Sequence, residues 1–229
     1  MIKTKQELEK LKIAATITDA GLTFALENIK SGTTERELAN KIADYFNQNA
    51  DGVSFDPIVA FKTTAESPWN ESGNRVIKGT GALLIDLGCV YQGYCGDLTR
   101  MVYIGRPTQK FMKIYDTVLQ AQKAAEDEIK LGEYFKNADI AARRVLTNQK
   151  LEQYFSTGLG HGVGKQVHEN PRIKKGCRTK IQNNMVFTLE PGVYIKGWGG
   201  VRIEDTYCFI NGKLQQLTKS PKNLFKINI

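Results

Sequence analysis

Apolar residues recur every three or four positions over residues 6–29, which is the spacing of one buried helix face. The stretch Lys30-Ser31-Gly32 ends this pattern. Thr34 and Glu37 then have the spacing of a capping box, in which each side chain binds the other residue's backbone N–H. We therefore predict a first helix over residues 6–29 and a second helix from about Thr34 to Asn49.

The rest of the chain repeats this order of patterns. A strand-like stretch covers residues 55–61, a third helix is predicted over residues 109–130, and a fourth begins near Asn137. Each pair of helices precedes a hairpin of short apolar runs, over residues 82–97 and 186–204. We predict one α+β domain, residues 1–229, in which a curved antiparallel sheet carries helices on its outer face.

The repeated order indicates an internal duplication. Ile29-Lys30-Ser31-Gly32 precedes one helix, and Ile129-Lys130-Leu131-Gly132 precedes another 100 residues later (129 − 29). Two such units would close two half-sites around one centre, because repeated units bury together what a single unit cannot. Residue identity between the two halves is slight, so coincidence remains the alternative.

Each hairpin carries an acidic residue on both of its strands. Asp86 and Asp97 belong to the first hairpin, and Glu190 and Glu204 to the second. An ionised carboxylate inside an apolar strand is costly unless a positive charge pairs with it. Together with His161, which lies between two glycines, these acids predict a buried metal site. Acids on the exposed face of half-buried strands are the alternative, which is disfavoured because apolar residues flank them on both sides.

The turns of the two hairpins set which acids face each other. A two-residue turn at Tyr91-Gln92 would place the two acids of the first hairpin directly opposite each other. A turn centred on Gly197 would do the same for the second hairpin. Two divalent ions would neutralise the four carboxylates. With one imidazole, such a ligand set suits manganese, iron, cobalt or zinc.

Composition narrows the remaining classes of protein. The hydrophobic fraction of 41% and the charged fraction of 24% are those of a soluble globular chain. A net charge of +8 would suit a nucleic-acid or anionic-surface protein. The lysines are scattered along the chain, so we interpret them as a solvated surface and predict no nucleic-acid partner.

The ends and the cysteines bear on location. The charged start of the chain is not that of a signal peptide, and no apolar stretch approaches the roughly 18 residues of a membrane span. The four cysteines form no CxxC pair, which is typical of reduced thiols in the cytosol. We predict a cytoplasmic protein without a membrane partner.

The candidate residues favour hydrolysis of an amide or ester, because two metal ions can hold a hydroxide between them and polarise a carbonyl. Glu190 is the candidate general base, since the Pro191-Gly192 turn would direct it into the cavity. His168 is a candidate proton donor or carbonyl ligand, with a surface loop histidine as the alternative. Arg202 shares a strand face with Glu204 and would either hold a substrate carboxylate or clamp that acid.

Six segments, in order, carry a family resemblance. They are Leu84-Ile85-Asp86-Leu87-Gly88, Gly93-Tyr94-Cys95-Gly96-Asp97-Leu98-Thr99-Arg100, Gly158-Leu159-Gly160-His161-Gly162-Val163-Gly164, Val167-His168-Glu169, Thr188-Leu189-Glu190-Pro191-Gly192-Val193-Tyr194 and Gly200-Val201-Arg202-Ile203-Glu204-Asp205. Together they resemble the catalytic domain of Xaa-Pro aminopeptidases and prolidases, whose pita-bread fold is shared with methionine aminopeptidases.

The resemblance implies a centre of two metal ions and a peptide substrate. Asp86 would bind one ion, and Asp97 and Glu204 would bridge both. His161 and Glu190 would complete the second ion's ligands. The implied reaction removes the N-terminal residue of Xaa-Pro peptides, and the implied ions are Mn, Co, Zn or Fe.

Two departures from the family pattern affect these expectations. Trp69 stands where the family's Pro-His motif supplies a histidine near the leaving nitrogen, so we expect Trp69 to line the substrate site and to weaken activity. The N-terminal domain that caps the site and supports dimers in relatives is expected to be absent, while a homodimer stays an expectation. A metal- or peptide-binding module and a methionine aminopeptidase-like enzyme remain alternatives. All five expected ligands are present, which favours an enzyme.

Overall fold

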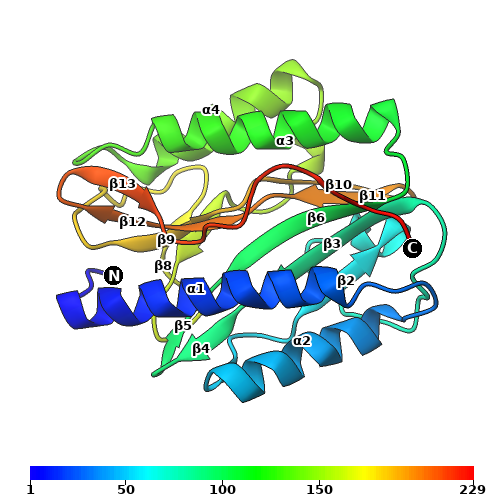
Figure 1. Ribbon diagram of the computed structural model, residues 1–229. Coiled ribbons are helices and arrows are strands. Elements are labelled where there is room, and N and C mark those ends of the chain that lie inside the picture. The colour runs from blue at the N-terminus through cyan, green and yellow to red at the C-terminus, as the bar shows by residue number, and fades with distance from the viewer.

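Four long helices flank the strands in two pairs. The computed structural model describes residues 1–229. In Figure 1, α1 (Lys5–Glu27) and α2 (Glu35–Asn49) lie along one side of the strands, and α3 (Gln109–Asp127) and α4 (Phe135–Asn148) lie along the other. None of these helices combines the length and the apolar character that a membrane crossing requires.

Local capping chemistry explains where the helices begin. The capping box predicted at Thr34 and Glu37 is present, and Thr4 and Glu7 form a second one ahead of α1. The helix ends differ by two or three residues from the prediction, since α1 ends at Glu27 and α3 at Asp127.

The strands form two larger and two smaller sheets. The four-stranded sheet has the order β14 (Phe225–Ile227), β6 (Leu98–Ile104), β3 (Gly81–Leu87), β2 (Ile58–Phe61). The five-stranded sheet has the order β13 (Lys213–Gln216), β12 (Asp205–Ile210), β9 (Val186–Leu189), β7 (Gly160–Gly162), β8 (Glu169–Ile173).

The smaller sheets pair β1 (Gly52–Val53), β4 (Cys89–Tyr91) and β5 (Tyr94–Cys95), and β10 (Gly192–Ile195) with β11 (Gly199–Arg202). Two short 3-10 helices, η1 (Lys62–Glu66) and η2 (Glu152–Tyr154), complete the elements. Pairing is antiparallel except that β14 runs parallel to β6, so the expectation of a wholly antiparallel sheet is wrong at that edge.

The first hairpin corrects a predicted register. Its turn is Gln92-Gly93, not Tyr91-Gln92, and both turn residues have positive φ, 47° and 76°. Such a turn matches the twist of the flanking strands, and glycine adopts it without steric cost. Asp86 therefore lies opposite Thr99. A shift of two positions leaves each side chain on the same face of the sheet. Asp97, two residues before Thr99, therefore stays on the face that carries Asp86.

The second hairpin has the predicted register. Val193 pairs with Val201 across the turn, and Leu189 pairs with Asp205 in the adjoining ladder. Each of these pairs is centred on Gly197, as predicted. Glu190 and Glu204 lie between the two ladders. Their residue numbers are also centred on Gly197, so the same register places them opposite each other.

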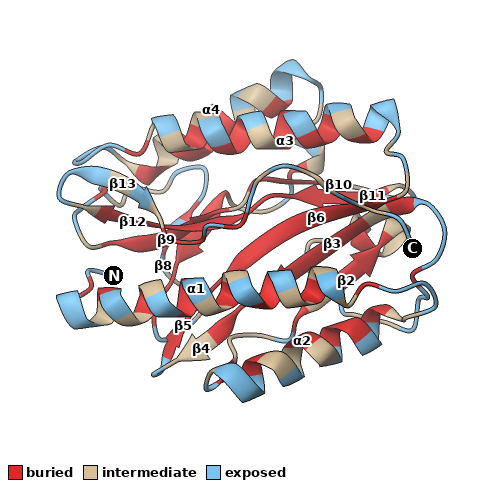
Figure 2. Cartoon of the chain, in the orientation of Figure 1, coloured by how far each residue is buried: buried red, intermediate tan, exposed pale blue.

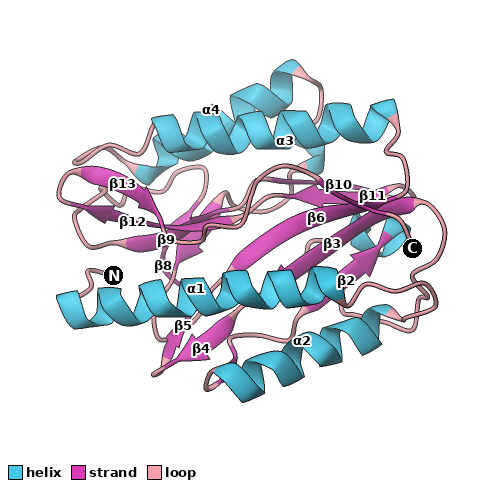
Figure 3. Ribbon diagram, in the orientation of Figure 1, coloured by secondary structure: helices cyan, strands magenta, loops and turns pink.

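Each pair of helices packs on its own apolar cluster. One cluster buries Phe111, Phe135 and Phe187 beneath α3 and α4, and another buries Leu22 and Phe46 beneath α1 and α2. Figure 2 shows buried residues on the inner faces of the helices and throughout the central strands. The predicted helix–helix–hairpin unit thus occurs twice, and Figure 3 shows one helix pair on each side of the strands.

Arg100 joins the two halves behind the central strands. Its guanidinium is fully buried and donates to Asp205 Oδ1 at 2.6 Å. It also donates to the carbonyl oxygens of Glu204 at 2.5 Å and Ser220 at 2.7 Å. Asp205 in turn accepts hydrogen bonds from Thr218 and from other side chains. β6, β12 and the C-terminal segment therefore meet at one buried ion pair.

Arg100→Met should destabilise the metal-free protein by about 3–5 kcal/mol, because it leaves the buried carboxylate of Asp205 without its main cation. Urea unfolding would measure this loss. Lys123→Met is the control, because its pair with Asp127 is exposed on both sides and should change stability by about 0.5 kcal/mol or less. Equal losses of stability in the two variants would contradict the role of Arg100 in joining the two halves.

Candidate metal centre and pocket

Three predicted ligands meet at the seam between the halves. Asp97, His161 and Glu204 are buried, and each offers one ligand atom within 4.8 Å of the others. Asp97 directly precedes β6, His161 lies on β7, and Glu204 lies between β11 and β12. The ligands therefore come from both halves, and the closure of one half upon the other brings them together.

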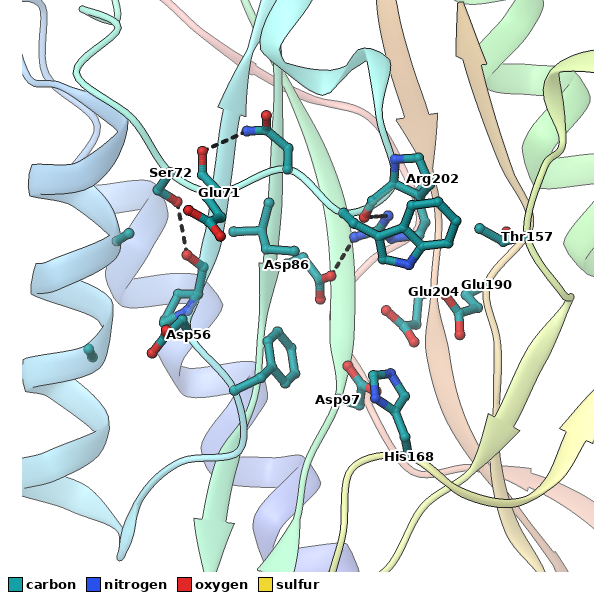
Figure 4. Close-up of a pocket in the computed structure, with 18 of the residues that line it drawn as sticks. Asp56, Glu71, Ser72, Asp86, Asp97, Thr157, His168, Glu190, Arg202 and Glu204 are labelled. Carbon is teal, nitrogen blue, oxygen red and sulfur yellow. Dashed lines mark hydrogen bonds and ion pairs between the residues drawn. The ribbon is translucent and has the colours of Figure 1, made fainter.

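The other two predicted ligands line the same pocket. Glu190 Oε1 lies 3.0 Å from His161 Nε2, which is also 3.5 Å from Asp97 Oδ2. Asp86 projects from β3, and its Oδ1 is buried without a hydrogen-bond partner. Figure 4 shows Asp97, Glu190 and Glu204 directed toward a common space, with Asp86 beside them. The orphaned oxygen is what a cation would bind.

The cluster is electrostatically strained without a cation. Burial, followed by the charge of a neighbouring acid, raises the pKa of Asp97 and of Glu204 well above the ordinary carboxyl value. Burial also raises the pKa of Asp86, although the charge of Arg202 opposes it. Burial disfavours ionised Glu190 too, but its hydrogen bond with His161 and the charge of His161 outweigh this, and its pKa is lowered. Oxygen ligands with one imidazole fit a hard or borderline divalent ion.

Arg202 clamps Asp86. Its Nη2 donates to Asp86 Oδ2, its Nε donates to Thr99 Oγ1 at 3.0 Å, and its Nη1 donates to Tyr194 OH at 2.7 Å. The alternative in which Arg202 clamps Glu204 is therefore wrong, because Arg202 binds Asp86 of β3 instead. A contact with a substrate carboxylate stays a prediction.

Thr99 is a functional neighbour that the sequence pattern alone does not identify. Its hydroxyl donates to Glu204 Oε2 at 2.6 Å while it accepts from Arg202. Such a contact orients a metal-binding carboxylate. The only signal in the sequence is that Thr99 follows Asp97 by two positions and so shares its strand face.

His168 lies beside the cluster in the loop before β8. Its ring and that of His161 meet edge to face with centroids 4.4 Å apart. Partial desolvation and the nearby charges of His161 and Arg172 lower the pKa of His168. The structure thus brings His168 to the predicted ligands (Figure 4).

The pocket extends well beyond the acids. It has a volume of about 710 Å³ and runs from the acidic cluster past Phe55 and Trp69 to Arg36 on α2. Trp69 lines it with 75% of its surface exposed. Arg202 Nη1 donates to the carbonyl of Pro68 at 3.3 Å, so the segment that carries Trp69 touches the residue that clamps Asp86.

Comparisons with known proteins agree on a family. The model of "Metallopeptidase family M24" matches residues 9–209. An Xaa-Pro dipeptidase from Pyrococcus furiosus is 38% identical over 98% of this chain and 65% of its own length, and one from Pyrococcus horikoshii is 37% identical over 98% and 64%. The chain thus spans slightly less than two thirds of these relatives.

Solved structures agree in fold. A dipeptidase from Pyrococcus horikoshii OT3 superposes with a TM-score of 0.97 at 37% identity, over 99% of this chain and 64% of that one. An X-Pro aminopeptidase from Thermotoga maritima superposes with a TM-score of 0.96 at 33% identity, over 99% and 65%. The pita-bread architecture expected from the sequence is confirmed.

Excess Mn²⁺ should raise the melting temperature, and chelator should reverse the effect. At about 100 times the dissociation constant, the expected gain is about 2.7 kcal/mol. Glu204→Gln should abolish this response. In chelator, it should be at least as stable as wild type, because a carboxylate with a raised folded pKa destabilises the fold at neutral pH when ionised. A melting temperature that changes with neither Mn²⁺ nor chelator would contradict a buried cation site.

Proposed function

Because this chain belongs to metallopeptidase family M24, we propose that it is a metal-dependent peptidase that removes the N-terminal residue from Xaa-Pro peptides. The observation that carries the proposal is the buried cluster of Asp97, His161 and Glu204, joined by Asp86 and Glu190 in one pocket. The Xaa-Pro dipeptidases among its relatives support the substrate class.

We propose that two divalent ions occupy this cluster. Asp86 would hold one ion through the oxygen left free by Arg202, and Asp97 and Glu204 would bridge to the second. His161 and Glu190 would complete the second ion's ligands. When bound, ions of the manganese, cobalt, zinc or iron type polarise a scissile carbonyl and lower the pKa of an attacking water.

Two side chains would move the protons. Glu190 lines the pocket beside the other ligands, and its carboxylate would accept a proton from the attacking water. His168 stands beside His161 at the pocket and would steady the carbonyl oxygen or deliver a proton to the departing nitrogen. Both roles require contact with a bound peptide, and both residues line the same pocket (Figure 4).

Substrate contacts would come from Trp69 and Arg202. Trp69 faces the same pocket as the cluster and would narrow the space for the peptide. Tryptophan donates through its indole N–H but cannot shuttle a proton. We therefore expect weak activity, directed to peptides with small N-terminal residues. A cytoplasmic location and a homodimer stay expectations, the first from the free cysteines and the second from the family resemblance.

The direct test is hydrolysis of Xaa-Pro dipeptides and longer Xaa-Pro peptides after loading with Mn²⁺, Co²⁺ or Zn²⁺. Release of the N-terminal residue that disappears in chelator supports the proposal. Release of methionine from Met-Ala peptides in preference to Xaa-Pro cleavage would favour a methionine aminopeptidase-like enzyme. Metal or peptide binding without any cleavage would favour a binding module.

Glu190→Gln should lower turnover by about 10²–10⁴-fold or more, because it removes the proposed base together with a ligand charge. Steady-state kinetics on an Xaa-Pro dipeptide would measure the loss. Glu71→Gln is the matched control, because Glu71 is an exposed acid at the far part of the same pocket. Near-native turnover of the Glu190 variant would reject the assignment.

Trp69→His should raise turnover by about tenfold or more, because an imidazole at this position restores a group that can deliver a proton to the leaving nitrogen. Trp198→His, at the other tryptophan of the chain, should leave the rate unchanged. If the wild-type protein already turns over at about 1–10³ s⁻¹, an ordinary enzymatic rate, then the histidine is dispensable.

A further inference from the structure

Glu35 is a buried acid outside the metal cluster. It is the first residue of α2, its exposed fraction is 0%, and no lysine or arginine forms an ion pair with it. Its carboxylate instead accepts three hydrogen bonds, from Phe61 N at 2.7 Å, from Thr64 Oγ1 and from Gly73 N at 3.2 Å. These donors, with the N-terminal end of the helix dipole, offset the cost of burying the charge.

All three donors belong to one stretch of chain, residues 61–73. Its first part is the end of β2 and the 3-10 helix η1, and its second part is a segment we name the strap, residues 67–73. Phe61 and Thr64 precede the strap, and Gly73 ends it. One carboxylate therefore holds the two ends of this stretch together.

Other contacts fix the far end of the strap in the same place. Arg36 N donates to the carbonyl of Gly73 at 2.9 Å, so the strap docks on the first turn of α2. The hydroxyl of Ser72 accepts from Val59 N and donates to the carbonyl of Pro57. Between these points, Trp69 is largely exposed and lines the pocket.

We propose that Glu35 is a positioning residue that fixes the strap. The strap then holds Trp69 as a stable wall of the pocket, and this wall contributes to the affinity for peptide. Glu35 itself touches neither the metal-ligand cluster nor the pocket. The part of this inference that concerns peptides rests on the proposed function. The part that concerns the order of the strap does not.

Glu35→Gln tests the proposal, because an amide presents an N–H₂ group where the carboxylate accepts a hydrogen bond. We expect KM for an Xaa-Pro dipeptide to rise about tenfold, the effect of one lost charge-assisted hydrogen bond, while kcat changes less than about threefold. The shift in melting temperature caused by Mn²⁺ should be unchanged. Glu37→Gln is the matched control, because Glu37 caps the same helix through Thr34 and makes no bond to residues 61–73.

Trp69 also reports on the strap directly. The chain has two tryptophans, so Trp198→Phe leaves Trp69 as the single indole. In that background, Glu35→Gln should lower fluorescence anisotropy and increase quenching by acrylamide, while Glu37→Gln should not. Thr64→Val, which removes one donor to Glu35 and keeps the side-chain shape, should change both signals in the same direction if the Glu35 variant does not fold.

The outcomes separate the two proposals. Unchanged fluorescence and KM in both the Glu35 and Thr64 variants, or equal changes in the Glu37 control, would overturn the positioning role. If the fluorescence of Trp69 changes as expected in a protein that cleaves no peptide, the positioning role is supported and the proposed function is rejected. A loosened Trp69 with unchanged KM would overturn the link to peptide affinity.

Discussion

Burial of several carboxylates at one seam is the constraint on which the rest of this structure depends. Asp86, Asp97, Glu190 and Glu204 line one pocket, and burial alone raises the cost of ionising each of them. Close acids in a site of low dielectric repel one another strongly. The fold tolerates this arrangement because His161 and Arg202 contribute partners, and a divalent cation would remove the remaining repulsion.

Two arginines support the cluster from opposite sides. Arg202 lies in the pocket, where it clamps Asp86 and meets Thr99 and Tyr194. Arg100 lies behind, where it holds the carbonyl of Glu204 and the carboxylate of Asp205. The planar, always charged guanidinium suits both places, because it makes several directed hydrogen bonds from one buried position. The acids are therefore held on strands whose own backbones are fixed, which is the arrangement that a precise site requires.

The duplicated architecture assigns different tasks to the two halves. The first half contributes Asp86 and Asp97, and the second contributes His161, Glu190 and Glu204. α2 of the first half also anchors the strap with Trp69 through Glu35, an acid that is buried but hydrogen-bonded by backbone and hydroxyl donors. The metal-ligand cluster thus rests on the seam between the halves, whereas the far end of the strap is held by the first half.

Local patterns in the sequence determined the elements and much of the site. Helical spacing and the Thr34–Glu37 capping box predicted α1 and α2, and the centre at Gly197 predicted the second hairpin's register. These succeed because capping, turn and alternation rules involve residues close in the chain. The four acids stood out because charges in apolar runs are rare, and His161 stood out because it lies between two glycines.

Only the tertiary structure decided which partners the charged residues take. The first turn fell at Gln92-Gly93 because backbone conformation, not residue parity, sets the register there. The clamp of Arg202 on Asp86 joins residues 116 positions apart, and Arg100 reaches Asp205 across 105. Glu35 likewise acts through a segment that packs against α2 only after folding. A buried ion pair or hydrogen bond forms between the groups that the packed strands bring together. The spacing of residues along the chain does not predict which groups these are.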